Sequence, residues 1–340
     1  MNTNRRFKLI LVALLGLSFS SFSIASKDIK NKDKDPLKQF SLALAEKSSL
    51  KADSILSVLK TLKPNKNIIK KMNRPAESLD WHRYRPIWMK KNRIEAGAKF
   101  LKKHQATLER AEKVYGVDKM IIVAIIGIET FYGRHKGTHS VLDALYTLAF
   151  HYPKRATFFT KELQEYFILA QEQNWDLKKI KGSYAGAMGI GQFISSSYRM
   201  YGVDFNGDGK IDLLNDPVDM IGSVAYYFKR HGWKKGKFIA KKIIMTQSQA
   251  KALVQKELRL NRTAAELKQL KINVDEVQDQ QSKVGVFSFK LKKGEEHWLA
   301  ANNFYTITRY NHNAMYALAV LQLSVAIKKQ LKKKLPTVNP

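Results

Sequence analysis

The 340-residue chain contains no cysteine. This absence excludes disulfides, thiolate metal sites, a cysteine nucleophile and a lipid-modified N-terminal cysteine. Long apolar segments are also scarce, because no stretch after residue 25 is long and apolar enough to span a membrane. With 44% hydrophobic residues, the chain can still build a substantial core. We therefore expect a globular protein without covalent cross-links, made of roughly two domains or one elaborated domain.

Acidic residues are few, since 60 lysines and arginines stand against 29 aspartates and glutamates, for a formal net charge of +31. The excess is uneven: residues 121–235 hold 14 basic and 11 acidic side chains, so the flanks carry most of the positive charge. Such a distribution suits an anionic polymer, which could be nucleic acid, a membrane surface or a cell-wall glycan. A solvated basic face without a specific partner is the alternative.

The first 25 residues predict an export signal. Three basic side chains among the first eight residues precede the apolar stretch Leu9–Phe19, and Ser23-Ile24-Ala25 fits a small-x-small cleavage site before Ser26. An uncleaved membrane anchor is the alternative, although the apolar stretch falls short of the ~20 residues that a spanning helix needs. We therefore expect a soluble periplasmic protein, and export makes nucleic acid the least suitable partner.

Several common catalytic patterns are missing as well. The chain has no Ser-His-Asp motif and no HExxH pair, and its glycine-rich stretch Gly182–Ile194 matches neither the dinucleotide nor the phosphate-loop pattern. The most distinctive segment that is present is the apolar run Met120–Ile128, which is closed by Glu129. A run that is apolar on every face predicts a buried element, and Asp118 as N-cap with Gly133 as stop favours a helix.

Glu129 is the candidate catalytic acid. Burial disfavours an ionised carboxylate, so we expect its pKa to be raised and the group to stay protonated near neutral pH, as a general acid requires. The alternative is a helix-end carboxylate that reaches solvent or pairs with Arg134. No second carboxylate is placed as strongly. Because ordinary glycosidases flank the scissile bond with two carboxylates, a glycan-cleaving enzyme of this kind would need its substrate to supply the nucleophile.

Residues 204–219 have the spacing of the first half of a calcium-binding loop, with glycine at the sixth position. Asn215 replaces the glutamate expected at the twelfth position, so the bidentate carboxylate has to come from Asp216 or, preferably, from Asp219. A metal-free turn rich in Asp and Asn is the alternative. The candidate ligands are Asp204, Asn206, Asp208, the backbone carbonyl of Lys210, and Asp219.

Hydrophobic periodicity predicts a mainly helical chain. The aromatic segment Asn73–Trp88 has no clear period and is expected to pack or to line a groove, whereas alternation over Lys283–Trp298 around a Lys-Lys-Gly turn predicts one or two short strands. The basic tail Lys328–Lys334 is expected to be frayed. Lysine-rich linkers are predicted over Ser26–Pro36 and from the end of the first helix as far as Lys71. One helix is predicted to begin at Ser140, one lies within Lys237–Leu270, and one follows the start of Asn302–Gln322. The other predicted helices are Phe40–Leu62, Ile94–Tyr115, Lys161–Glu172 and Met220–His231.

Four separated blocks of the sequence agree, in the same order, with one known family. The blocks are Ile126–Gly133, Gly182–Gly189 with Gln192-Phe193, the calcium-type loop, and Phe304-Tyr305 to Tyr316. On these blocks the sequence resembles the lytic murein transglycosylase B family. The resemblance runs from about Arg74 to Gln322, and it is specific because the four blocks are separate from one another.

The resemblance implies a mainly α fold: a lysozyme-like (goose-type) catalytic core with an α-helical flanking subdomain and a small β-containing insertion. The expected division is a signal peptide (1–25), a basic helical lead-in (26–72), the core with its calcium loop (73–236), a mixed α/β insertion (237–300), a groove-lining segment with the C-terminal helix (301–327) and a basic tail (328–340).

The activity that the resemblance implies is cleavage of the β-1,4 bond between N-acetylmuramic acid and N-acetylglucosamine in peptidoglycan. The product would carry a 1,6-anhydromuramoyl end, without net hydrolysis. Glu129 would act first as acid and then as base, and the acetamido group of the substrate would stabilise the cationic centre. No catalytic cofactor is expected. The alternatives are a hydrolytic muramidase on the same fold and a non-catalytic peptidoglycan-binding protein.

The resemblance also assigns site residues by position. Ser183 and Gln192 would hydrogen-bond the sugar near the cleavage point, while Tyr310, Asn311 and Tyr316 would line the groove around the catalytic acid. For each of these residues, core packing or loop stabilisation is the alternative.

The resemblance also implies a metal ion and binding partners. A structural calcium ion is implied at the ligands Asp204, Asn206, Asp208, Lys210 and Asp219, and Tyr132 and Phe193 are expected to serve packing. The implied partners are peptidoglycan glycan strands, with cell-wall synthases or a membrane surface reached through the basic flanks. No nucleic acid is expected to bind, and the chain is expected to act as a monomer.

Overall fold

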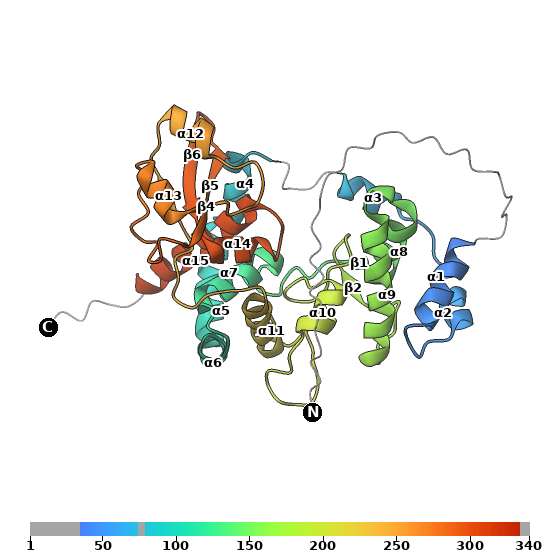
Figure 1. The fold of residues 1–340 in the computed structure, drawn as a ribbon. Coiled ribbons are helices and arrows are strands. Elements are labelled where there is room, and N and C mark those ends of the chain that lie inside the picture. Colours follow the sequence, from blue (N-terminus) through green and yellow to red (C-terminus); the bar gives the residue numbers. More distant parts are fainter. Residues whose placement is uncertain (1–34, 74–78, 334–340) are drawn as a thin grey trace, which may run out of the picture.

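Figure 1 shows the fold of the computed structural model, which describes residues 35–73 and 79–333. The predicted export signal, the lead-in as far as residue 34 and the end of the basic tail from residue 334 lie outside the described residues. Helices dominate the described chain, as predicted, and the larger of its two small sheets lies within residues 240–300. Among the described residues, no helix combines the length and the apolar character needed to cross a membrane.

The N-terminal helices pack beside a long helical hairpin (Figure 1). The rings of Phe150 and Phe167, one from each arm of the hairpin, lie 5.8 and 6.2 Å from the ring of Phe40. The hairpin consists of α8 (Val141–His151) and α9 (Ala156–Glu172), joined by the short 3-10 helix η2 (Pro153–Arg155), and the N-terminal helices are α1 (Pro36–Ala45), α2 (Ala52–Lys60) and α3 (Lys66–Met72).

Two predictions for this region are wrong. The periodicity predicts one helix over Phe40–Leu62, but the chain turns between α1 and α2, where the hydroxyl of Ser48 donates to the carbonyl of Leu44 at 2.7 Å. Bonds of this kind compete with continuation of a helix. The lysine-rich linker before Lys71 is helical as α3, because the side chain of Asn65 caps it by accepting a hydrogen bond at 3.0 Å.

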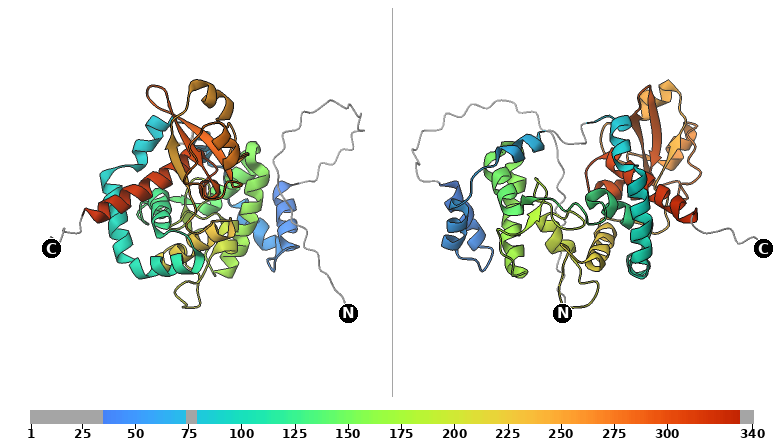
Figure 2. Two further views of the ribbon diagram at one scale, coloured as in Figure 1. Left: turned by 60° about the vertical axis from the view of Figure 1, so that its left-hand side comes forward. Right: turned by 180° about the vertical axis from the view of Figure 1, so that it is seen from behind.

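A second group of helices forms the core around the predicted buried run (Figure 2). Every residue of Met120–Ile128 is buried within α7, as predicted, and Asp118 caps this helix by accepting from the N–H of Met120 at 2.7 Å. The group consists of α5 (Lys91–Lys103), α6 (Gln105–Tyr115), α7 (Lys119–Thr130), α11 (Pro217–Arg230) and α15 (Ala314–Lys332), which is preceded by the short α14 (Asn302–Thr308).

Several predicted helix limits in this group are wrong, and α11 begins at Pro217 rather than at the predicted Met220. The helix predicted over Ile94–Tyr115 is interrupted at His104, which separates α5 from α6. The helix α7 ends at Thr130, three residues before Gly133, and the next residue, Phe131, takes a left-handed φ of 53°. The basic tail is helical as far as Lys332, because α15 continues along α5 and α7.

The larger sheet has the antiparallel strand order β3-β6-β5-β4. The hairpin of β5 and β6 confirms the strands predicted over Lys283–Trp298, and it turns at Gly294 with a φ of +70°. The segment Lys237–Leu270 is helical only in part, since it also contributes β3 and β4. The elements are β3 (Ala240–Ile243), α12 (Gln247–Leu253), β4 (Arg262–Thr263), α13 (Ala264–Gln269), β5 (Lys283–Lys290) and β6 (Glu295–Ala300).

The aromatic segment before the core packs against this sheet, as predicted, but it does so as the helix α4 (Trp81–Trp88). The ring of Trp81 lies 5.5 Å from that of Phe289, and its Nε1 donates to Glu296 at 2.9 Å. The pattern hides this helix because Pro86 lies inside it, where proline removes a backbone donor. Residues 74–78 of the segment lie outside the described residues.

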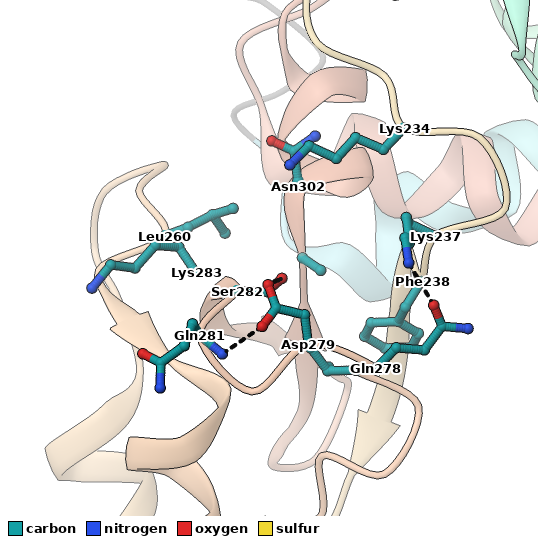
Figure 3. Close-up of a pocket in the computed structure, with 12 residues that line it drawn as sticks. Lys234, Lys237, Phe238, Leu260, Gln278, Asp279, Gln281, Ser282, Lys283 and Asn302 are labelled. Carbon is teal, nitrogen blue, oxygen red and sulfur yellow. Dashed lines mark hydrogen bonds between the residues drawn. The ribbon is translucent and has the colours of Figure 1, made fainter.

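A cavity of about 480 Å³ lies between the sheet-containing part and the segment that follows α11 (Figure 3). Inside it, Lys237 donates to Gln278 at 2.7 Å, and Asp279 accepts from the N–H of Gln281 at 3.0 Å. None of the predicted site residues lines this cavity. Its lining is Lys234, Lys237, Phe238, Leu260, Val277, Gln278, Asp279, Gln281, Ser282, Lys283, Ala301 and Asn302.

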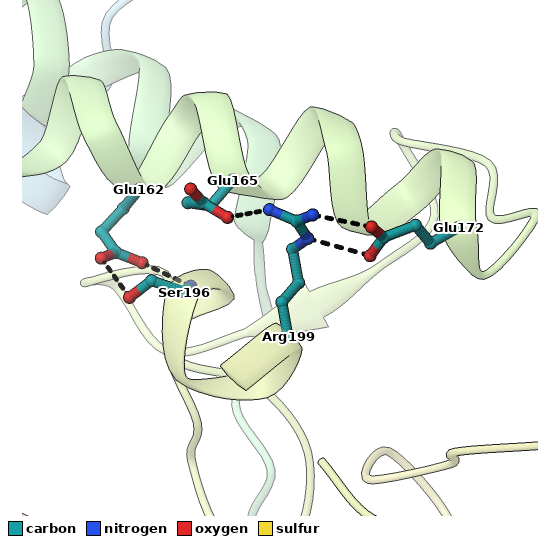
Figure 4. Close-up of polar contacts among 5 residues, drawn as sticks. All are labelled: Glu162, Glu165, Glu172, Ser196 and Arg199. Atoms are coloured by element: carbon teal, nitrogen blue, oxygen red, sulfur yellow. Dashed lines mark hydrogen bonds and ion pairs between the residues drawn. The ribbon is translucent and has the colours of Figure 1, made fainter. Parts of the chain in front are cut away.

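Between the hairpin and the core lie a two-stranded ribbon, β1 (His139–Ser140) with β2 (Lys181–Gly182), and the short helix α10 (Ser195–Tyr201). Figure 4 shows how α10 is attached to α9. Arg199 bonds to both Glu165 and Glu172, and the N–H and hydroxyl of Ser196 donate to Glu162 at 3.0 and 2.6 Å. Glu162 is 4% exposed, and burial raises its pKa although the bonds from Ser196 lower it.

Candidate active site

Glu129 lies one residue before the end of α7, where α15 packs along that helix. Its Oε1 accepts a hydrogen bond from the hydroxyl of Tyr316 at 2.5 Å. Tyr316 is only 2% exposed and lies in the first turn of α15, which is capped by the side chain of Asn313. Glu129 itself is partly exposed. The structure therefore brings together two of the predicted site residues from positions far apart in the sequence.

The chain leaves α7 through a strained turn. Phe131 and Tyr132 take left-handed φ values of 53° and 61°, which residues with a side chain avoid and which tend to occur at functional sites. Thr130 holds this turn, because its hydroxyl donates to the carbonyl of Ile190 at 2.6 Å and accepts from the N–H of Gly133 at 2.8 Å. The end of the Glu129 helix is thus fixed to the glycine-rich loop.

Arg93 on α5 supports the same end of α7. Its guanidinium donates to the carbonyl of Gly127 and lies 4.9 Å from the ring of Phe131 and 5.1 Å from that of Trp88. A cation is favourable near a helix C-terminus. The hydroxyl of Tyr132 donates to the backbone carbonyl of Arg93 at 3.0 Å, so Tyr132 packs here, as predicted. Burial lowers the pKa of Arg93.

The glycine-rich loop carries Ser183 and Gln192 at its two ends. The hydroxyl oxygen of Ser183 accepts from two backbone N–H groups of its own turn, at 3.1 and 3.2 Å. The amide nitrogen of Gln192 donates to the carbonyls of Lys136 and Gly189, at 3.1 and 3.0 Å. Both side chains therefore stabilise the loop. These bonds leave the hydroxyl hydrogen of Ser183 and the amide oxygen of Gln192 for other partners.

Tyr310 joins this loop to α11. Its hydroxyl donates to the carbonyl of Gly191 at 2.6 Å, and its ring stacks on Phe228 with centroids 5.7 Å apart. A Cβ at Gly191 would lie 2.4 Å from the sulfur of Met220, so a larger residue here would require the Met220 side chain to move. Phe193, which is 3% exposed, meets the ring of Tyr310 edge-on and serves packing, as predicted.

Asn311 follows Tyr310 in the short link to α15, where its carbonyl accepts from the N–H of Asn313 at 2.7 Å. The three predicted groove residues Tyr310, Asn311 and Tyr316 thus belong to one segment. A small cavity of about 120 Å³ adjoins Gln192 and Tyr310. Its lining is Gln192, Phe193, Ile194, Ser197, Tyr227, Arg309 and Tyr310.

The electrostatics of the site keep both tyrosines protonated. Burial raises the pKa of Tyr310 and Tyr316 well above the ordinary value, and the negative charge of Glu129 raises both further. A protonated phenol is a hydrogen-bond donor. Tyr316 therefore donates to Oε1 of Glu129, which fixes one oxygen of the carboxyl group.

The predicted metal ligands lie in one compact loop. Asp204 accepts from two glycine N–H groups at 2.7 and 2.8 Å, and Asp219, only 1% exposed, accepts from three backbone N–H groups at 2.8 to 3.3 Å. The amide nitrogen of Asn206 lies between two carboxylates, 3.1 Å from Asp208 and 2.7 Å from Asp216. Oxygen donors gathered in this way suit a hard cation such as Ca²⁺.

The donor set fits calcium only when it includes neutral oxygens. Within the part of the chain that the structure describes, no three His, Cys, Asp or Glu side chains form a metal site by themselves. The set therefore also needs the amide oxygen of Asn206 and the carbonyl of Lys210. The loop is connected to the candidate active site through Lys136, whose ammonium donates to Asn215 at 2.8 Å and whose carbonyl accepts from Gln192.

Sequence patterns assign no role to three residues that shape this site: Arg93, Thr130 and Lys136. Each acts through a contact between segments far apart in the chain, which periodicity does not reveal. Together with the predicted residues, they hold the carboxyl group of Glu129 against the phenol of Tyr316 and fix the end of its helix to the glycine-rich loop. A mainly helical, lysozyme-like fold with a single carboxylate of this kind is typical of enzymes that cleave glycans with one acid.

The comparisons with known proteins identify the family. Residues 32–325 match the transglycosylase SLT domain, so the chain belongs to this family. It is 42% identical over 247 residues to the membrane-bound lytic murein transglycosylase B of Escherichia coli (strain K12), a match that covers 73% of this chain and 67% of that protein.

Solved structures of lytic transglycosylases have the same fold. SltB1 from Pseudomonas aeruginosa, crystallised in a catenated form, matches with a TM-score of 0.82 and 41% identity, over 88% of this chain and 98% of that chain. Slt35 from Escherichia coli in complex with calcium matches with a TM-score of 0.80 and 36% identity, over 88% of this chain and 95% of that chain.

Proposed function

We propose that the protein is a peptidoglycan lytic transglycosylase in which Glu129 is the catalytic acid and then the catalytic base. The observation that carries this proposal is the 2.5 Å hydrogen bond from Tyr316 to Oε1 of Glu129. With Oε1 held by a neutral donor, the proton for the leaving group is assigned to Oε2. Membership of the transglycosylase SLT domain family and the similarity to lytic murein transglycosylase B support the substrate class.

The chemistry follows from one carboxyl group. Protonated Glu129 gives its proton to the glycosidic oxygen, and the bond from that oxygen to C1 of N-acetylmuramic acid breaks. The acetamido oxygen of the same sugar bonds to C1 and compensates the positive charge. Ionised Glu129 then takes the proton of the 6-hydroxyl, whose oxygen attacks C1 and displaces the acetamido oxygen. The acid is restored, a 1,6-anhydro ring forms and no water is consumed.

The substrate groove is proposed to use five side chains. Ser183 and Gln192 bind the sugar next to the cleaved bond. Ser183 uses its hydroxyl hydrogen and Gln192 its amide oxygen, the atoms that their hydrogen bonds within the loop do not use. Tyr310, Asn311 and Tyr316 line the opposite wall. A more distant relative, SltB3 from Pseudomonas aeruginosa, which is 26% identical with a TM-score of 0.74, has been solved in complex with NAG-NAM-pentapeptide.

Calcium is proposed as a structural ion and has no part in the reaction. Asp204, Asn206, Asp208, the carbonyl of Lys210 and Asp219 would hold it, and it would tighten the loop that contacts Lys136. The complex of Slt35 with calcium supports this proposal. Asp216 is the alternative carboxylate, because it lies as close to Asn206 as Asp208 does.

We further propose a soluble periplasmic protein that acts as a monomer. The name of the Escherichia coli relative describes that protein as membrane-bound. This chain has no cysteine to carry a lipid, so any association with the membrane would have to use the uncleaved first 25 residues or the basic flanks. The same flanks are the proposed contact with cell-wall synthases, and nucleic acid is not a proposed partner.

The products of the reaction test the proposed function. Purified sacculi are incubated with the protein, and the soluble muropeptides are analysed by mass spectrometry. We expect 1,6-anhydro ends, which are lighter than reducing ends by one water. Reducing ends would identify a hydrolytic muramidase, and a folded protein that binds sacculi without releasing products would identify a non-catalytic binding protein.

A further inference from the structure

We propose that a basic pocket beside the glycine-rich loop binds a carboxylate of the peptide stem that peptidoglycan strands carry. This inference rests on the proposed function and adds a second contact to the same substrate. The stem pocket, as we call it, has a volume of about 480 Å³. It is lined by Asn67, Lys70, Lys71, His139 and Tyr184.

Three separate elements build the stem pocket. The helix α3 contributes Asn67, Lys70 and Lys71, whose spacing of three and four residues places them on one face of the helix. The strand β1 contributes His139, which is paired in register with Gly182 of β2. Tyr184 comes from the loop after β2. Because Tyr184 directly follows Ser183, the stem pocket adjoins one end of the proposed sugar site.

The chemistry of the stem pocket suits an anion. The ammonium of Lys71 lies 2.9 Å from Nε2 of His139. Burial lowers the pKa of His139, and the positive charge of Lys71 lowers it further, so the imidazole is neutral at pH 7 and accepts this bond. Lys71 keeps two further N–H donors. Among the described residues, none of the side chains lining the stem pocket is acidic, and neither lysine forms an ion pair.

A stem carboxylate is the anion that this position favours. The carboxyl groups of a peptide are ionised at neutral pH, and lysine is a point-charge donor that tolerates a flexible ligand. The pocket is open to solvent, so a chain branching from a sugar bound at Ser183 can enter it. The ring of Tyr184 offers an apolar wall for the aliphatic part of such a chain.

A binding experiment separates charge from shape. The probes are NAG-NAM-pentapeptide with free carboxylates and the same molecule with every carboxylate converted to a carboxamide. Binding to the intact protein is measured by calorimetry at low salt. Because an exposed ion pair contributes little, the free acid should bind only roughly two- to fivefold more tightly than the amidated probe. Equal affinities for the two probes would overturn the proposal.

The double variant Lys70→Gln/Lys71→Gln locates the effect. It should bind both probes equally, whereas the control Lys66→Gln, on the same helix but outside the stem pocket, should keep the preference. All three positions are exposed, so the variants should keep the wild-type melting temperature. A double variant that keeps the full preference would overturn the assignment. Competition by inorganic phosphate as strong as that by the free-acid probe would also overturn it, because the site would then be a general anion site.

Kinetics distinguish failure of the stem pocket from failure of the proposed function. On sacculi, the double variant should have a KM raised by roughly two- to fivefold with kcat unchanged, because the lost contact is remote from the bond that breaks. On glycan strands stripped of their stems, the variant and the wild type should have the same KM. No product from the wild type on either substrate would refute the proposed function. An unchanged KM of the double variant on sacculi would refute only the stem pocket.

Discussion

The hydroxyl of Tyr316 donates a 2.5 Å hydrogen bond to Oε1 of Glu129, across an interval of 187 residues. Two long helices, α7 and α15, meet at this bond. Burial and the charge of Glu129 keep Tyr316 protonated, so the phenol donates at every pH at which the protein is expected to work. The bond fixes the orientation of the carboxyl group that has to deliver a proton.

Replacing Tyr316 with phenylalanine tests this relationship. Tyr316→Phe removes one hydrogen bond to a charged group, an interaction of about 1.5–3 kcal/mol, so kcat should fall roughly ten- to hundredfold. Release of muropeptides from sacculi under saturating conditions is the measurement. Tyr310→Phe is the matched control, because it removes a phenol bonded to the carbonyl of Gly191, and its kcat should fall less. If Tyr316→Phe kept the wild-type kcat, the bond would have no catalytic role.

A second prediction concerns Thr130, which joins the end of α7 to the glycine-rich loop. Thr130→Val removes its bonds to Ile190 and Gly133 and leaves a buried carbonyl and a partly buried N–H without this partner, so the free energy of unfolding should fall by about 1–3 kcal/mol. Activity should fall as well, because the turn after Glu129 loosens. Urea unfolding and product release measure the two effects. Thr130→Ser keeps the hydroxyl and should restore both, and a serine variant as weak as valine would contradict this role.

The buried carboxyl group of Glu162 should make stability depend on pH. Its pKa in the folded protein is raised by burial above the value in the unfolded chain, so the folded protein binds this proton more tightly. The contribution of Glu162 to stability is therefore fully present below its unfolded pKa. It is lost as pH rises through the folded pKa, because the ionised carboxylate is the form that burial disfavours.

The variant Glu162→Gln isolates this contribution because glutamine does not titrate. Urea unfolding of the variant and the wild type between about pH 4 and pH 8 is the measurement, over the range in which a raised carboxyl pKa would lie. The stability of the variant relative to the wild type should increase as pH rises. The same replacement at the exposed Glu257 is the control. A difference between variant and wild type that stays constant over this range would show that Glu162 does not titrate with a raised pKa.

Calcium should stabilise the folded protein through residues 204–219. Adding calcium to metal-free protein should raise the melting temperature progressively, because the ion binds the folded state. A free calcium concentration of about 100 times the dissociation constant should raise the free energy of unfolding by about 2.7 kcal/mol. Asp208→Ala should abolish the rise, whereas Asp53→Ala, an exposed change in α2, should not. Differential scanning calorimetry is the measurement. No rise in the wild type would leave the loop as a metal-free turn.

The sequence predicts the buried helix of Glu129 well, because an unbroken apolar run between an N-cap residue and a glycine is compatible with few structures other than a buried helix. The glycine-rich loop and the hairpin of β5 and β6 are predictable for similar local reasons. Helix interruptions are not, since the turn at Ser48 and the break at His104 depend on how neighbouring segments pack. The helix α4 is hidden by Pro86, which local propensity treats as a breaker.

The candidate site is predictable only in part. Glu129 follows from its position at the end of a buried run, and Tyr316 follows only from the resemblance to a known family. No local signal reveals the roles of Arg93 and Thr130, because these roles depend on contacts with Gly127 and Ile190 that exist only after the chain has folded. Residues that support a catalytic group through tertiary contacts are therefore the part that sequence patterns miss.

The measurement that tests the central claim most directly is the release of anhydromuropeptides from purified sacculi by Glu129→Gln. Glutamine keeps the shape of the side chain and can still accept a bond from Tyr316, but it cannot supply a proton. Since general acid–base catalysis contributes roughly 10²–10⁴-fold to a rate, we expect the loss of product release to be at least of this size, at an unchanged melting temperature. A folded Glu129→Gln variant that released anhydromuropeptides at the wild-type rate would contradict the assignment of Glu129 as the catalytic acid.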